Sequence, residues 1–106
     1  MGAEKTLFEA PTPLGFIVTV TAEQWEKIAT LKHPVMSGRQ MDVQETLQKP
    51  QEIRRSTKDL GVFLFYRGER PDRWLCAVAK KLGRQGFLMT ACVTDAVKIG
   101  EDVWKG

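Results

Sequence analysis

The sequence predicts a single α+β domain in which an N-terminal strand and two helices precede a roughly four-stranded antiparallel sheet. Three observations lead to this fold class. The chain has 106 residues, which suits one hydrophobic core. Helical patterns occupy the first half of the chain, and apolar runs separated by short turns occupy the second. Such a segregated order is typical of α+β domains whose helices pack on one sheet face.

The chain divides into an extended lead-in at residues 1–15 and the domain itself at residues 16–106. Pro11 and Pro13 disfavour regular structure in the lead-in. Residues 16–20 are apolar and mostly β-branched, so they predict the first strand.

A helix is expected at residues 22–32. Thr21 and Gln24 have the spacing of a capping box, in which the Thr21 hydroxyl accepts from the Gln24 amide and the Gln24 side chain reaches back. Trp25 belongs to the apolar side of this helix. Pro34 ends the helix, because the residue before a proline avoids helical angles.

The second helix and the sheet follow. Val43 and Leu47 have helical spacing within residues 42–47, and Pro50 closes that short helix. Strands are then expected at residues 52–56, 61–66, 74–79 and 87–93, with short turns between the last three. These turns predict an antiparallel meander. We expect a short helical turn at residues 94–99 and, after it, a tail at residues 100–104 that docks its tryptophan.

Charge and cysteine content narrow the classes of function. The formal charge of +3 and the pI of about 9.0 permit nucleic-acid binding without requiring it. Cys76 and Cys92 lie in predicted strands, where we expect buried, reduced thiols. With a single histidine they cannot complete a four-ligand zinc site, so we expect neither metal nor cofactor. No apolar run approaches the roughly 20 residues of a membrane span and no secretory signal is visible, so we expect a cytoplasmic protein without membrane contact.

Cleavage of RNA without a metal needs a base, an acid and groups that stabilise the charged phosphorane. His33 is the natural acid or base, because its unperturbed pKa of about 6.5 lies near neutrality. The alternative is that His33 only caps the C-terminus of the helix before Pro34.

Arg54 and Arg55 are candidate phosphate ligands, since a guanidinium grips a phosphate through two hydrogen bonds. Strand alternation places the two side chains on opposite faces, so only one can face a site. The alternative is a solvated edge strand, which would also allow two copies of the chain to pair as a homodimer. Ser56 could donate to a phosphate or serve as a turn residue.

Three further residues lie on the following strands. Tyr66 could stack on a base, or pack its ring in the core with its hydroxyl at the surface. Lys80 could bind phosphate or solubilise the end of a strand. Thr90 lies mid-strand in an apolar run, where its hydroxyl needs either a local partner or a site on the sheet face.

Together, these residues give the chain a resemblance to a known group of nucleases. The stretches that carry it are His33-Pro34, Val43 to Leu47 with Pro50, Ile53 to Ser56, Phe63 to Tyr66, Trp74 to Lys80, Gly86 to Ala91, Thr94-Asp95 and Gly100 to Trp104. This pattern resembles the phage-barnase-EndoU-colicin-RelE-like nuclease group and covers about residues 19–104.

The resemblance implies a barnase/RelE-like fold and a metal-independent ribonuclease, either a toxin or a phage-derived effector. It implies that His33 is the acid or base and that Arg55 and Lys80 bind phosphate. Ser56 and Thr90 would then be polar residues at the sheet site. The implied partners are RNA and an antitoxin or immunity protein. The alternative is a non-catalytic binding or assembly protein of the same fold.

Overall fold

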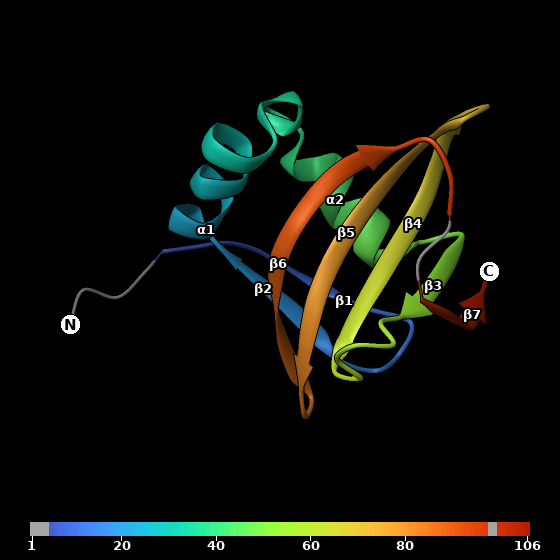
Figure 1. Ribbon diagram of the computed structural model, residues 1–106. Coiled ribbons are helices and arrows are strands. Elements are labelled where there is room, and N and C mark those ends of the chain that lie inside the picture. The colour runs from blue at the N-terminus through green and yellow to red at the C-terminus, as the bar shows by residue number, and fades with distance from the viewer. Residues whose placement is uncertain (1–4, 98–99) are drawn as a thin grey trace.

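The computed structural model describes residues 5–97 and 100–106, and these build one seven-stranded mixed sheet (Figure 1). Its strand order is β1-β2-β6-β5-β4-β3-β7. The strands are β1 (Thr6–Pro11), β2 (Ile17–Thr21), β3 (Glu52–Arg55), β4 (Val62–Arg70), β5 (Arg73–Leu82), β6 (Gln85–Thr94) and β7 (Glu101–Lys105). Strands β2 and β6 pair in parallel, whereas all other described pairs are antiparallel.

The expected four-stranded antiparallel sheet is therefore wrong. The meander of β4, β5 and β6 is present, but β2 joins it in parallel, because Ile17 pairs with Gln85 and Thr19 with Phe87. Strand β1 lies inside the lead-in at residues 1–15 and pairs with β2. Its proline Pro11 is compatible with a strand because β1 is at the sheet edge, where one row of backbone N–H groups needs no partner.

The tail at residues 100–104 is also a strand. Strand β7 pairs with β3, and Trp104 lies opposite Ile53 and packs against the main core. The tryptophan thus docks as predicted, although the segment that carries it extends the sheet. The short helical turn expected at residues 94–99 is not found in its described part, because Thr94 is the last residue of β6 and residues 95–97 are not helical. Residues 98 and 99 lie outside the described residues.

The helical segments are α1 (Ala22–Glu26), the π-helical η1 (Lys27–Lys32), the 3₁₀ turn η2 (Pro34–Met36) and α2 (Gln40–Gln48). The Gln24 amide donates to Thr21 Oγ1 at 3.1 Å, which confirms the predicted N-cap. The Gln24 side chain does not complete the capping box, because it binds strand β6 instead. None of the described helices is long and apolar enough to cross a membrane.

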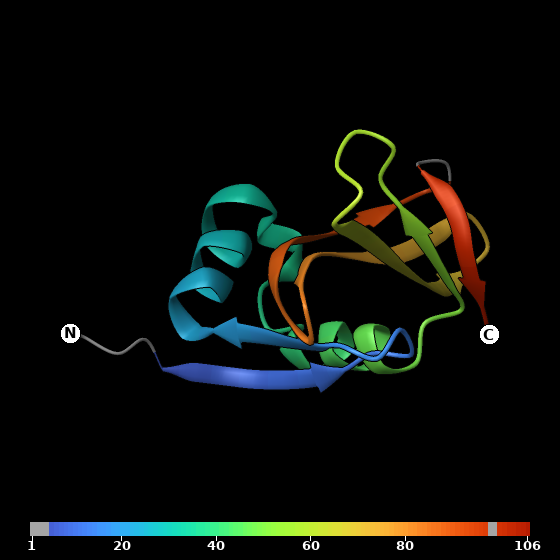
Figure 2. The same cartoon turned by 90° about the horizontal axis from the view of Figure 1, so that it is seen from below.

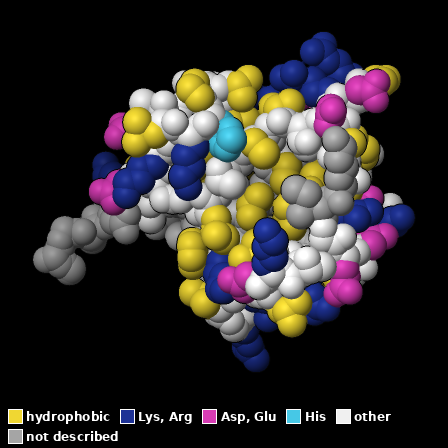
Figure 3. All heavy atoms as spheres, viewed as in Figure 1, with side chains coloured by type: hydrophobic (Ala, Val, Ile, Leu, Met, Phe, Trp, Pro, Cys, Tyr) yellow, Lys and Arg dark blue, Asp and Glu magenta, His cyan; other side chains and the backbone are white. Residues whose placement is uncertain are grey.

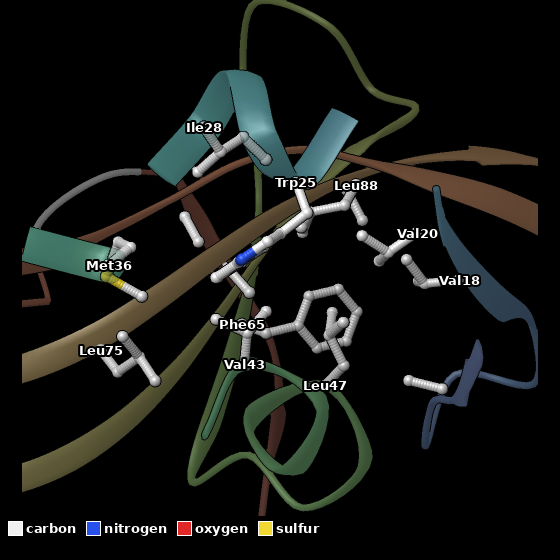
Figure 4. Close-up of a cluster of buried hydrophobic side chains, with 14 of the residues drawn as sticks. Val18, Val20, Trp25, Ile28, Met36, Val43, Leu47, Phe65, Leu75 and Leu88 are labelled. Atoms are coloured by element: carbon white, nitrogen blue, oxygen red, sulfur yellow. The ribbon is translucent and has the colours of Figure 1, made fainter. Parts of the chain in front are cut away.

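The main core lies between the helices and one face of the sheet. Ile53, Phe65, Ala77 and Ala91 form a continuous row across β3, β4, β5 and β6, and all four are fully buried. Helix α2 packs against β1, β4 and β5. Figure 4 shows the core side chains between these elements, including Val18, Val20, Trp25, Ile28, Met36, Val43, Leu47, Phe65, Leu75 and Leu88.

The opposite face of β4, β5 and β6, which we call the open face, carries no described helix (Figures 1 and 2). It nevertheless holds a second, smaller apolar cluster. Leu64, Tyr66 and Cys76 are buried there, with partly buried Trp74, Val78, Cys92 and Val97 packed around them. Figure 3 shows hydrophobic side chains gathered in the middle of this face, with charged groups around them.

Candidate functional site

Two rows of side chains cross the open face. In the first row, Thr90 of β6 lies opposite Val78 of β5, which lies opposite Leu64 of β4 and then Arg54 of β3. The second row, one step along the strands, runs in the same order through Cys92, Cys76, Tyr66 and Glu52. Lys80 lies two residues from Val78 on β5, so it shares this face.

Thr90 is the most informative residue of the first row. Its Oγ1 is shielded from solvent and has no hydrogen-bond partner among the described residues. A buried hydroxyl without a partner costs about 1–3 kcal/mol. The local partner that the sequence allowed for Thr90 is thus not found in the described part of the chain, where the hydrogen bond of this hydroxyl is unused.

The strand is irregular next to Thr90. Val78 pairs with Thr90 whereas Ala79 pairs with Leu88, so β6 bulges at Met89. Bulges are frequent beside functional sites because they redirect side chains. The freed carbonyls are bound by the first helix: Gln24 Nε2 lies 3.2 Å from the Leu88 oxygen and 3.1 Å from the Met89 oxygen.

Lys32 connects the end of η1 to the bulge of β6. Its Nζ lies 3.3 Å from the Met89 oxygen, directly before Thr90. The next residue, His33, ends η1 by donating its backbone N–H to the Ile28 oxygen at 2.8 Å, and the following turn η2 also contacts β6. The segment that carries His33 is therefore adjacent to the strand that carries Thr90.

Both cations of the open face have acidic partners. Lys80 Nζ lies 2.6 Å from Asp59 Oδ2, and this contact, with a hydrogen bond from the Gly61 amide, lowers the pKa of Asp59. Arg54 Nε lies 2.6 Å from Glu52 Oε2, and its Nη1 donates to the Gly100 oxygen at 3.1 Å.

Arg55 does not join this group. It pairs with Phe63, which packs against the main core, so its side chain leaves β3 on the face opposite that of Arg54. Arg55 Nη2 binds Glu101 Oε1 at 2.5 Å, while its Nε is shielded from solvent without a partner in the described part of the chain. The two arginines do face opposite sides, and Arg54 is the one on the open face.

Ser56 and Tyr66 have structural partners. The Ser56 hydroxyl accepts from the amides of Lys58 at 3.2 Å and Asp59 at 3.3 Å, as a turn residue does. Tyr66 is buried beside Cys76 in the second cluster, and burial raises the pKa of its phenol. Its ring has too little exposed surface to stack on a base.

The structure thus brings Thr90, Lys80, Arg54 and Tyr66 onto one face and places the His33 segment beside it. Arg55 lies on the opposite face of the sheet, which carries the main core. Sequence reasoning missed Lys32 and Gln24, which hold the bulge, and it missed the acidic partners. The sequence places Lys32 and Gln24 on the first helix but does not indicate that they bind β6, because their partners Leu88 and Met89 are far away in the sequence.

A separate cavity of about 280 Å³ lies between α2 and the ends of β4 and β5, lined by Asp42, Glu45, Thr46, Arg67, Gly68, Glu69 and Leu75. Its charges pair with one another or with residues next to the cavity: Arg67 binds Glu45 at 2.5 Å, and Arg39 binds both Glu69 and Asp42. Among the described residues no group of three or more His, Cys, Asp or Glu is placed to hold a metal ion.

The chain matches no family model, no curated protein and no solved structure. The resemblance to the nuclease group is therefore still a prediction from the sequence, and the function is inferred from the residues of the open face.

Proposed function

We propose that this protein binds the RNA backbone on its open face and cleaves it without a metal ion. The observation that carries the proposal is the buried, partnerless hydroxyl of Thr90 near Lys80, on the face that also carries Arg54. An O–H donor with a cation nearby is suited to a phosphate, because the anion would receive its hydrogen bond and balance the charge of the lysine.

The chemistry assigns one role to each group. His33 takes the proton of the 2′-hydroxyl or gives one to the leaving 5′-oxygen. Thr90 donates to a non-bridging phosphate oxygen, and Lys80 stabilises the negative charge that grows on the phosphorane. Arg54, three strands and about 14 Å away in the same row, binds another phosphate of the RNA backbone. The products are a 2′,3′-cyclic phosphate and a 5′-hydroxyl.

Phosphate binding requires Lys80 to exchange its carboxylate partner for the ligand. The side chains of Lys80 and Asp59 are 29% and 49% exposed, so their ion pair is a surface pair. Such pairs contribute at most about 1 kcal/mol. The exchange therefore costs little, and Asp59 would keep the cation in place while the site is empty.

The test is cleavage of short RNA by purified protein in EDTA, with analysis of the product ends. We expect cyclic phosphate ends, and no cleavage of a DNA analogue that lacks the 2′-hydroxyl. His33→Gln should slow cleavage by about 10²-fold or more, and Thr90→Val by about 10²-fold. Thr30→Val, at an exposed position of η1, is the matched control and should keep full activity.

Folded wild-type protein that leaves a broad panel of RNAs intact would overturn the proposal. The alternative, a non-catalytic binding or assembly protein, would then take its place. Activity that survives in both His33→Gln and Thr90→Val would remove this site from the mechanism even if the protein cleaves RNA.

A further inference from the structure

The second row of the open face contains two cysteines in direct opposition. Cys76 of β5 and Cys92 of β6 are register partners in an antiparallel pair, and both are free thiols. Residues in register point to the same side of the sheet. Cys76 is 4% exposed, whereas Cys92 is only partly buried.

The bulge at Met89 creates this opposition. Near the turn, Leu82 pairs with Gln85 and Ala79 with Leu88, and this register would place Cys76 opposite Ala91. The extra residue shifts the register by one, so that Cys92 faces Cys76 and Ala91 faces Ala77 in the core. The inserted position therefore brings Cys92 onto the open face, where Cys76 already lies.

The spacing of such a pair suits a disulfide. Opposed residues of an antiparallel pair have Cα atoms about 4.5–5.5 Å apart. Disulfides join Cα atoms about 4.4–6.8 Å apart. The Cα separation expected for this pair therefore lies within the range that disulfides join.

The two thiols differ in reactivity. The Cys76 thiol donates a hydrogen bond to the Cys92 sulfur, which lowers the pKa of Cys92 to about 7 although burial opposes ionisation. The same hydrogen bond, together with burial, raises the pKa of Cys76. Cys92 is thus the thiol that ionises near neutral pH, and the thiolate is the form that attacks disulfides.

We propose that Cys76 and Cys92 are a redox pair that closes into a cross-strand disulfide by exchange with a small-molecule disulfide such as glutathione disulfide. The Cys92 thiolate attacks one sulfur of glutathione disulfide, which forms a mixed disulfide and releases one glutathione thiolate. Cys76 then gives up its proton and attacks the Cys92 sulfur, and the second glutathione leaves. The protein loses two electrons and two protons, and glutathione disulfide becomes two glutathione molecules.

This inference does not depend on the proposed ribonuclease activity. It rests on the register of the two cysteines, on their free thiols and on their different burial, and its test needs no RNA. The folded protein is incubated with excess glutathione disulfide, quenched in acid and measured as an intact mass. We expect a loss of about 2 Da, the mass of two hydrogens, and no remaining thiol that an alkylating reagent labels.

Two variants locate the bond. Cys76→Ser should stop at the glutathione adduct on Cys92, because no second thiol resolves it. Cys92→Ser should stay largely unmodified, because Cys76 is buried. The wild-type chain in denaturant is the control for geometry, and there the closed product should form more slowly than in the folded protein.

Wild-type protein that keeps both thiols or remains a glutathione adduct would overturn the proposal. An intermolecular dimer as the sole product would do the same. If Cys76→Ser does not fold, Cys92→Ser and the wild-type mass still decide the question.

Discussion

Replacement of Thr90 by valine should stabilise the protein while it disables the proposed site. The substitution exchanges a hydroxyl for a methyl of similar size and keeps β-branching, which strands favour. A gain in stability together with a loss of activity is not expected for an ordinary residue of a sheet. It is expected where the native side chain lowers stability but binds a ligand.

The expected gain follows from the surroundings of the hydroxyl. Thr90 Oγ1 is shielded from solvent and has no partner among the described residues, so its removal relieves a penalty of about 1–3 kcal/mol. For a domain near this size each kcal/mol raises Tm by roughly 4–8 °C. Thr90→Val should therefore melt at a clearly higher temperature than the wild type.

The assay is urea unfolding followed by circular dichroism, with the same substitution at a satisfied hydroxyl as the control. Thr46 is fully buried, but its Oγ1 donates to the Asp42 oxygen at 2.8 Å. Thr46→Val should therefore lose about 0.5–1.5 kcal/mol. The two identical exchanges should move stability in opposite directions.

The opposite outcome is a Thr90→Val variant that is destabilised as much as Thr46→Val. That result would mean that the Thr90 hydroxyl has a partner in the free protein. It would then have no unused hydrogen bond to offer to a phosphate.

Three further outcomes are expected. Glu69→Gln should lose about 1 kcal/mol at neutral pH. Arg39 lowers the pKa of Glu69, so this difference should begin to shrink as pH falls below the ordinary carboxyl value of 4.5 and should vanish once pH is below the lowered pKa, as measured by urea unfolding at each pH. Phe65→Ala should lose about 3–5 kcal/mol in the same assay, because the ring is fully buried. Asp59→Asn frees Lys80 and keeps the oxygen that caps the loop, so RNA should bind a few-fold more tightly by fluorescence anisotropy.

Each of these has its own control. A stability difference for Glu69→Gln that does not shrink as pH falls below 4.5 would show that its origin is not the ion pair. Phe87→Ala removes a ring that is 45% exposed and should cost much less than the core substitution. Asp72→Asn changes the net charge by the same amount as Asp59→Asn but in the turn after β4, and equal effects on RNA binding would exclude a local role for Asp59.

The sequence predicted the central meander well. Strands β4, β5 and β6 are long, apolar and joined by turns, so each has a local signal. Strands β1 and β7 lack one, because both are short and at the sheet edges. Strand β1 ends in a proline and β7 is largely charged, so only pairing with β2 and β3 makes them strands. Strand β2 was predicted from its composition, but no local pattern states which strand will be its neighbour.

The candidate site also has features that the sequence predicts locally and features that depend on strand register or on distant contacts. Alternation predicted that Arg54 and Arg55 face opposite sides, but the choice between them required the register with β4. The thiol pair depends on the bulge, which shifts Cys92 by one position relative to a regular hairpin. The contacts of Lys32 and Gln24 with β6 join distant segments, and such contacts leave no trace in local composition.

The parallel pairing of β2 with β6 also bears on how the chain folds. β2 and β6 are separated by most of the chain, so the closing of this pair carries a large entropic cost and is expected to be slow. During synthesis the β1–β2 hairpin emerges first but has no sheet to join until the meander is complete. Until then Val18 and Val20 lack the neighbours that bury them in the folded protein, and we expect chaperones to bind this exposed apolar segment of the nascent chain.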